Sequence, residues 1–374
     1  ADLGLDPSRW SRVEPLMRAL CGEHAAAVCV GRGAVGLVPV ATGRVAPDGP
    51  DAGPETRFAV ASLTKPVVAT LTLQAVERGE LALGNPVSQH LPDFTGGRKR
   101  RVRLRHLLTH TSGLPDLLPD DRELRLAEAP LEEFIQRTIA TPLLFDPGRN
   151  CRYSSLGFAL LWAVLDGAAA DGATGLLKRR LFEPLGMTSS SLGAGGQLSE
   201  ETGLIAQIGA PATDGSHLED RVPIWNGDYW RRLGAPWGGM IATAADLGRF
   251  CAMWASGGAG LLSPATVRVA TNNALESMRQ VPEELRRCRP WGLGWRLIWP
   301  ARGAYFGDLL PPRTYGHWGA TGTVMWIEPQ TGLWAVVVTA RPQEPNGAIC
   351  ARLSNAIVAS LRDESPLAVW RSGE

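Results

Sequence analysis

Short apolar runs are concentrated near the two ends of the chain, whereas the middle has a longer, helical period. A run of four to eight apolar or alternating residues between turn residues is typical of a strand, and apolar positions three or four apart are typical of a helix. The glycines of Gly31-Arg32-Gly33 separate the first two apolar runs and predict a hairpin. We expect strands at residues 25–30, 34–40, 291–295, 314–318, 324–328 and 333–339, and helices at 7–20, 243–255 and 346–361.

Residues 79 to 186 have a mostly helical pattern that proline and glycine interrupt. Because the strands come from both ends of the chain, the simplest arrangement is one antiparallel sheet flanked by the terminal helices, with the middle inserted as a helical domain. The expected fold class is therefore α+β, an α/β sandwich plus a helical domain. We place the α/β domain at residues 1–84 and 186–374, the helical domain at 85–185, and the active site at their interface.

Two polar segments qualify this outline. The basic run Arg98–Arg105 alternates with apolar residues after Arg101, which suits an edge strand with one solvated face. It lacks the interleaved aromatic residues of a nucleic-acid surface, so nucleic acid is not the expected partner. Residues 186–236 are rich in Gly and Ser and are expected to form a long loop, a feature that often carries function.

The stretch Thr56–Pro66 predicts a short strand that leads into a helix. Ser62 and Lys65 are three residues apart, so at a helix start they share one face, with Cβ atoms about 5–6 Å apart. Pro66 fits the first helical turn, where backbone N–H groups have no helical partner. Residues 67–76 are apolar almost all round, so this helix should be buried.

A serine hydroxyl becomes a good nucleophile when a base takes its proton. Burial can lower the pKa of a lysine enough for it to act as that base, whereas an arginine in a protein stays protonated. Of the 38 Lys and Arg residues, three are lysines: Lys65, Lys99 and Lys178. A lysine near a serine on a buried helix, in a chain that otherwise uses arginine, predicts a nucleophile and its base. The alternative is a capping serine beside a solvated lysine.

Composition narrows the class of protein. The chain is 44% hydrophobic and 20% charged with a net charge of +1, which indicates a globular protein without a field that attracts nucleic acid or anionic membranes. It has no run of about 18 apolar residues, so no membrane span is expected. The six scattered cysteines form no C-x-x-C pair, which favours reduced thiols and the cytoplasm. The first residues do not resemble a signal peptide, and a signal already removed is the alternative.

His106 and His110 have the spacing of a metal-binding pair on a predicted helix. The Glu of H-E-x-x-H is missing and no third ligand is evident in the sequence, so we expect both histidines to be structural. The sequence therefore predicts neither a metal nor another cofactor.

Three motifs, taken in order, resemble those of the serine β-lactamase and penicillin-binding-protein superfamily. They are Ser62-Leu63-Thr64-Lys65, Tyr153-Ser154-Ser155 and His317-Trp318-Gly319. Tyrosine in the second motif is similar to the class C β-lactamase branch and its esterase relatives, the family VIII carboxylesterases. The stretches 104–114, 238–247, 291–295 and 316–322 match the same branch, and the resemblance runs from about residue 7 to 361.

This resemblance implies the fold and a role for each motif residue. Ser62 would be the acylated nucleophile, Lys65 its proton acceptor, and Tyr153 the group that assists proton transfer to the leaving group and from the deacylating water. The backbone N–H groups of Ser62 and Ala320 would form the oxyanion hole, in agreement with the donors that a helix N-terminus offers. The substrate-binding residues would be Ser155, His317, Trp318, Gly319 and Trp237.

Three positions depart from the family pattern. Ser155 stands where Asn is usual, His317 where Lys is usual, and Trp318 where the residue is usually small. An imidazole largely neutral at pH 7 binds a substrate carboxylate less well than a fixed cation does. We therefore expect a small-molecule carboxylic ester of a short or medium acyl chain, cleaved through an acyl-enzyme. A β-lactamase, a D-amino-acid-type peptidase or a transacylase is the alternative on the same fold, and a non-catalytic acyl-binding homologue is disfavoured by the intact Ser62, Lys65 and Tyr153.

Overall fold

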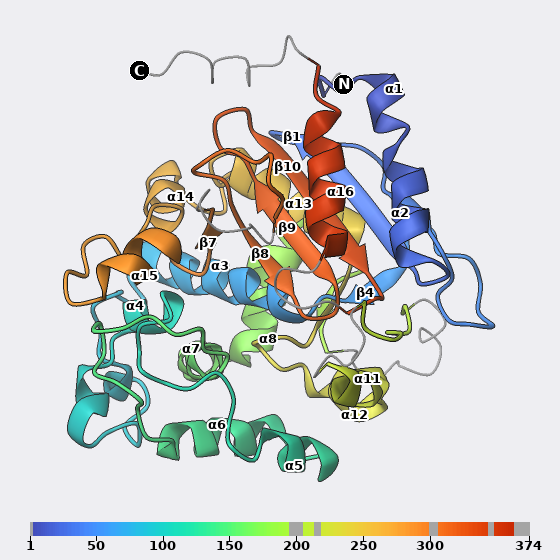
Figure 1. The fold of residues 1–374 in the computed structure, drawn as a ribbon. Helices are drawn as coiled ribbons and strands as arrows, with labels where there is room; N and C mark the ends of the chain where they lie inside the picture. The colour runs from blue at the N-terminus through green and yellow to red at the C-terminus, as the bar shows by residue number, and fades with distance from the viewer. Residues whose placement is uncertain (1–2, 194–204, 213–217, 299–305, 343–347, 363–374) are drawn as a thin grey trace.

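The computed structural model describes residues 3–193, 205–212, 218–298, 306–342 and 348–362 (Figure 1). The strands are β1 (Ala26–Arg32), β2 (Val35–Gly36), β3 (Val40–Thr42), β4 (Arg57–Ala59), β5 (Ser191–Leu192), β6 (Met240–Thr243), β7 (Arg296–Leu297), β8 (Tyr315–Gly319), β9 (Thr323–Ile327) and β10 (Leu333–Thr339). The 3-10 helices are η1 (Ala61–Leu63), η2 (Val87–Gln89), η3 (Gly97–Arg101) and η6 (Glu219–Arg221), and η4 (Lys178–Phe182) is a π-helical turn.

The α-helices surround the sheets. They are α1 (Pro7–Trp10), α2 (Val13–Cys21), α3 (Thr64–Glu77), α4 (Leu104–Leu108), α5 (Asp121–Leu126), α6 (Leu131–Ala140), α7 (Leu156–Gly167), α8 (Gly172–Leu177), α9 (Glu183–Leu185), α11 (Val222–Asn226), α12 (Asp228–Leu233), α13 (Ala244–Ala255), α14 (Pro264–Ala270), α15 (Glu283–Cys288) and α16 (Ala348–Ala359).

The larger sheet joins the two ends of the chain. Its order is β2-β1-β10-β9-β8-β7, with β3 also paired to β1. The first and last long strands, β1 and β10, are antiparallel neighbours from Ala26–Thr339 to Arg32–Leu333. The other pairings in this sheet are antiparallel as well. The predicted fold class is confirmed: an antiparallel sheet from both termini, flanked by helices.

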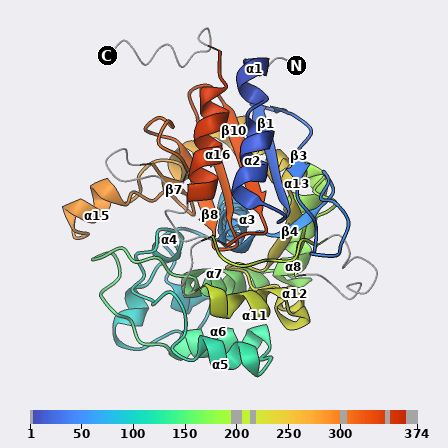
Figure 2. The same cartoon turned by 45° about the vertical axis from the view of Figure 1, so that its right-hand side comes forward.

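The long strands of this sheet are buried on both faces. Along β1, Ala26 and Val28 pack into a core shared with α2 and α16, while Ala27 and Cys29 face the opposite core, which contains α3 and α13 residues. This alternation follows from the two-residue period of a strand. Figure 2 shows α2 and α16 lying together over one face of the sheet, with α13 behind it. The helices from α4 to α8 lie below the larger sheet in the view of Figure 1.

A second, three-stranded sheet was not expected from the sequence. Its order is β4-β6-β5, and β4 pairs with β6 through Arg57–Thr243 and Ala59–Ile241. Thr243 also caps α13, because its hydroxyl accepts a hydrogen bond from the N–H of Asp246 at 3.1 Å. The small sheet thus fixes the strand that enters the Ser62 turn.

The edge strand predicted for the basic run is wrong. Residues 98–105 form η3 and the start of α4 rather than an edge strand. Lys99 and Arg98 donate to the carbonyl oxygens of Ile139 and Leu143, at and just beyond the C-terminus of α6, where cations are favoured. Residues of the basic run therefore bind backbone carbonyls at and just beyond the C-terminus of α6.

Three further expectations need correction. The predicted helix at 7–20 is two helices, α1 and α2. Residues 291–295 are not a strand: Gly294 has φ +83, and a Cβ there would lie 2.3 Å from the Cβ of Ala69 on α3. Residues 186–236 contain β5, α11 and α12 among their described positions rather than a bare loop. The domain boundaries proposed above stay predictions.

Within the described residues, no single helix has the length and apolar character needed to cross a membrane. The segments Leu156–Gly167 and Gly172–Leu185 meet those criteria together, but they are bent by 87° to each other. Most of α7 is buried within the protein, which accounts for its apolar composition.

Candidate active site

The turn between β4 and α3 presents Ser62. Ala61 has a positive φ of 47°, a conformation that a residue with a side chain adopts only where its surroundings hold it. The Thr64 hydroxyl supplies part of that hold, since it donates to the Ala61 carbonyl at 2.6 Å and accepts from the N–H of Met240 at 3.1 Å. Ser62 is left partly exposed at this turn.

Lys65 lies behind Ser62 in the first turn of α3 and has no exposed surface. Its Nζ atom is 3.0 Å from Ser62 Oγ and donates to the carbonyl of Trp237 at 2.8 Å. Burial lowers the pKa of Lys65 to about 7, against a smaller opposing effect of the Asp116 carboxylate. A neutral amine suits this position, because it can donate to Trp237 while its lone pair faces the Ser62 hydroxyl.

Tyr153, which precedes α7, brings the second motif to the same place. The Lys65 Nζ atom lies 4.7 Å from the centre of the Tyr153 ring. The Tyr153 ring also stacks on Trp318, with centroids 5.8 Å apart. The structure therefore brings together residues of all three motifs from segments far apart in the sequence.

His317 is fully buried beside these groups, with its Nδ1 atom 2.8 Å from the carbonyl of Trp318. Burial and the nearby Lys65 lower the pKa of His317 to about 3, so the imidazole is neutral at pH 7. Trp318 keeps part of its surface exposed. Direct contact of either residue with a substrate stays a prediction.

The turn between β8 and β9 is hydrogen-bonded to the backbone that precedes Ser62. Thr321 Oγ1 donates to the carbonyl of Ala59 at 2.6 Å, and Thr323 Oγ1 donates to the carbonyl of Val60 at 3.0 Å. A Cβ on Gly319 would lie 2.4 Å from that same Val60 oxygen, so a larger residue would separate the two segments. This close approach brings Ala320 beside the Ser62 turn, while the oxyanion hole itself stays a prediction.

Two of the predicted substrate-binding residues, Ser155 and Trp237, make contacts within the protein through their backbone or ring. The N–H of Ser155 donates to Asp116 Oδ1 at 2.9 Å. Trp237 is buried with its ring 5.8 Å from that of Phe134, and its backbone carbonyl is the group that holds Lys65. Sequence reasoning missed both Asp116 and the Trp237 carbonyl, because a backbone acceptor has no signature in a sequence and Asp116 lies just outside the motifs.

The expected helical pair of histidines is not formed. The helix α4 ends at Leu108, and His110 has φ +57, so His106 and His110 do not share a helix face. His106 Nδ1 accepts the N–H of Arg103 at the start of α4, whereas His110 Nδ1 accepts the N–H of Ser154, next to Tyr153. In the part of the chain that the structure describes, no three His, Cys, Asp or Glu residues are placed to hold a metal ion.

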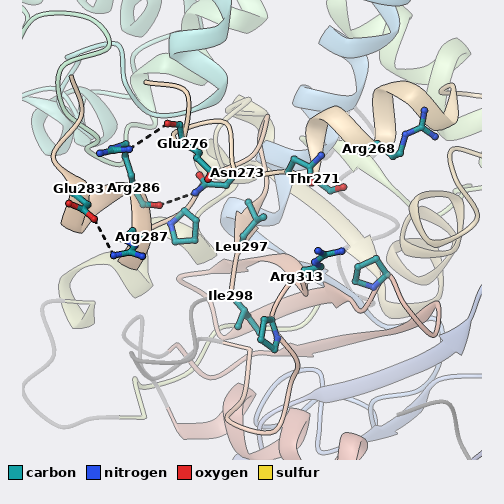
Figure 3. A pocket seen from close by; sticks show the side chains of 14 residues that line it. Arg268, Thr271, Asn273, Glu276, Glu283, Arg286, Arg287, Leu297, Ile298 and Arg313 are labelled. Carbon is teal, nitrogen blue, oxygen red and sulfur yellow. Dashed lines mark hydrogen bonds and ion pairs between the residues drawn. The ribbon is translucent and has the colours of Figure 1, made fainter. Parts of the chain in front are cut away.

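A cavity of about 910 Å³ lies beyond β7 (Figure 3). Its walls include Leu297 and Ile298 of the sheet edge together with Arg313 and residues of α15. An ion pair between Arg287 and Glu283 closes part of its rim at 3.1 Å. Neither Ser62, Lys65 nor Tyr153 lines this cavity, so its position does not bear on the role of those residues.

The fold and the convergence of the three motifs define a protein of the β-lactamase and transpeptidase-like class. The Beta-lactamase family model matches residues 20–359, and the chain belongs to this family.

The names of relatives in this class indicate different activities. The chain is 37% identical to esterase EstB of Burkholderia gladioli over 148 residues, which cover 36% of this chain and 38% of EstB. It is 28% identical to penicillin-binding protein 4 of Amycolatopsis lactamdurans over 306 residues, 75% of this chain and 71% of that protein. The match to EstB thus spans little more than a third of its length. A family VIII carboxylesterase structure superposes with a TM-score of 0.76 at 17% identity, covering 96% of this chain and 99% of that one, which shows a shared fold.

Proposed function

We propose that the protein is a serine hydrolase that cleaves carboxylic esters of short or medium acyl chains through an acyl-enzyme on Ser62. One observation carries this proposal: a fully buried lysine, with a pKa lowered to about 7, lies 3.0 Å from a partly exposed serine hydroxyl. A general base is most effective when its pKa is near the working pH. Lys65 meets that condition, and the partial exposure of Ser62 supports its role as the nucleophile.

In the acylation step, Ser62 Oγ attacks the ester carbonyl and passes its proton to neutral Lys65. The bond from the carbonyl carbon to the alcohol oxygen then breaks, and Tyr153 assists delivery of the proton to the departing alkoxide. In deacylation, water attacks the acyl carbon and its proton passes through Tyr153 and Lys65 to Ser62 Oγ. The bond from the acyl carbon to Oγ breaks, and the carboxylic acid leaves. The backbone N–H groups of Ser62 and Ala320 stabilise the oxyanion in both steps.

The charges near Lys65 favour an uncharged ester over a β-lactam. His317, at the position where the family pattern has a lysine, is buried and neutral. Arg296 is the guanidinium on the strand beside His317, and its Nη1 and Nη2 atoms donate to the carbonyls of Pro290 and Cys288. Because His317 replaces the lysine of the family pattern, a substrate carboxylate would lose a charge-assisted hydrogen bond at this position, which contributes about 1.5–3 kcal/mol.

The similarity to esterase EstB supports the same choice. The longer match to penicillin-binding protein 4 favours a second candidate, a β-lactamase, peptidase or transacylase that uses the same residues.

The test is the catalytic efficiency of the purified protein on p-nitrophenyl butyrate and on nitrocefin at pH 8. The loss of a carboxylate anchor corresponds to about 10–100-fold in rate, so we expect the ester to be preferred by at least that factor. Ser62→Ala serves as the background for both substrates. A preference for nitrocefin would make the protein a β-lactamase with an unusual anchor for the carboxylate.

A further inference from the structure

The loop from His110 to Asp116 is hydrogen-bonded to the segment that carries Tyr153. Hydrogen bonds run from residues on both sides of Tyr153 to this loop. They are Arg152 N to His110 O (2.9 Å), Ser154 N to His110 Nδ1 (3.1 Å), Ser154 Oγ to Pro115 O (2.8 Å), Ser155 N to Asp116 Oδ1 (2.9 Å) and Leu156 N to Asp116 O (3.2 Å). The position of Tyr153 is therefore set largely by a loop about forty residues earlier in the chain.

His110 makes two of these bonds, one on each side of Tyr153. Its backbone carbonyl holds the preceding residue, Arg152, and its ring nitrogen holds the following one, Ser154. The ring itself packs on Tyr153 with centroids 4.6 Å apart and meets the edge of Trp291 at 4.3 Å. His110 thus contacts the peptide and the phenol ring of the same motif.

The state of the His110 ring follows from these contacts. Because Nδ1 accepts a hydrogen bond from an N–H group, the neutral ring carries its proton on Nε2. Burial and the nearby Lys65 and His317 lower the pKa of His110 well below its ordinary value, so the ring stays neutral and Nδ1 stays an acceptor. The backbone of His110 has φ +57, a conformation that is uncommon for residues other than Gly, Asn, Asp and His. A histidine held in this way is fixed in both tautomer and orientation.

We propose that His110 is a positioning residue, which holds the phenol of Tyr153 against Lys65 by clamping the peptides on either side of it. This inference rests on the proposed function, in which Tyr153 delivers a proton to the leaving group. A shift of Tyr153 by about 1 Å can slow such a step by about 100-fold. The effect should depend on how much the leaving group needs that proton.

Two substrates separate positioning from general damage. The alkoxide of ethyl butyrate must be protonated as it leaves, whereas p-nitrophenolate leaves without a proton. The measured quantity is the ratio of kcat/KM for ethyl butyrate to that for p-nitrophenyl butyrate. A variant that only lowers the amount of folded enzyme reduces both values equally and leaves the ratio unchanged.

The variants remove or retain the acceptor at position 110. His110→Phe keeps a ring but has no acceptor for Ser154, and we expect it to lower the ratio by about 10–100-fold. His110→Asn can accept the same hydrogen bond and tolerates the positive φ, so the ratio should stay within about threefold of wild type. His110→Gly, which also tolerates the φ but has no acceptor, replaces the Phe variant if that protein does not fold, with the same expected loss. His106→Asn is the matched control and should leave the ratio unchanged, because His106 contacts Arg103 rather than the Tyr153 segment.

Two results overturn the inference. One is a ratio that stays at the wild-type value in both His110→Phe and His110→Gly, and the other is a loss in His110→Asn as large as in those variants. If the wild-type protein hydrolyses neither ester, the proposed function fails instead. The two failures are therefore distinguishable.

Discussion

Replacing Lys65 by arginine keeps a basic side chain at the same place but removes the ability to accept a proton. Lys65 Nζ is 3.0 Å from Ser62 Oγ, and the pKa of Lys65 is lowered to about 7. At pH 8 about nine in ten wild-type molecules then carry a neutral amine. With arginine, the neutral fraction falls to roughly one in ten thousand or less. The variant therefore replaces a mostly neutral base by a permanent cation that cannot accept the proton of Ser62.

The expected loss can be stated from this comparison. A positioned general base contributes about 10²–10⁴-fold to a rate, which corresponds to about 3–5 kcal/mol. Lys65→Arg should lose that factor in kcat/KM, nearly as much as Lys65→Ala. The wild-type rate should also rise about tenfold between pH 6 and pH 8, because Lys65 loses its proton as the pH rises through about 7.

The assay is steady-state hydrolysis of p-nitrophenyl butyrate from pH 6 to pH 9. Lys178→Arg is the matched control, because the Lys178 side chain is 72% exposed and should tolerate arginine without loss of rate. Since arginine is larger than lysine in a fully buried site, Lys65→Met provides a variant of closer volume that also lacks a base. Circular dichroism and Tm show whether each variant folds. Retention of more than a tenth of wild-type kcat/KM by folded Lys65→Arg would refute the role of Lys65 as the base.

Two other predictions concern the surroundings of Lys65 and the absence of a metal role. Asp116→Asn removes the negative charge that raises the pKa of Lys65, so the acidic limb of the pH–rate profile should move to lower pH. The control Asp48→Asn, at an exposed position, should leave that limb in place, and a shift of the Asp116→Asn profile to higher pH would contradict this reasoning. EDTA should leave hydrolysis unchanged, because His106 and His110 each hold a backbone N–H instead of facing a common ligand; loss of activity that zinc restores would show a metal site.

The sequence predicted those features that depend on local pattern and motif order. The strand β10 lies at the predicted residues 333–339, and α13 begins after its Thr243 cap, because apolar periodicity and capping act over a few residues. The proximity of Ser62 and Lys65 follows from their spacing at a helix start. The presence of Tyr153 beside them could be expected only from the family resemblance.

Other features depend on contacts between distant segments. The basic run at 98–105 alternates like a strand, yet its side chains close the end of α6, which no local pattern shows. His106 and His110 are four residues apart, as on one face of a helix, but α4 ends between them and the His110 ring packs on Tyr153. The carbonyl of Trp237 beside Lys65 comes from a segment 172 residues away. The domain boundaries and the cytoplasmic localisation stay predictions.

The acyl-enzyme on Ser62 is the central claim, and intact mass spectrometry tests it most directly. The protein is exposed briefly to a p-nitrophenyl phosphonate ester, and peptide mapping then locates the adduct. We predict a single adduct on Ser62, its absence in Ser62→Ala, and loss of ester hydrolysis in step with labelling. An adduct on another residue, or hydrolysis that survives complete labelling of Ser62, would contradict the account.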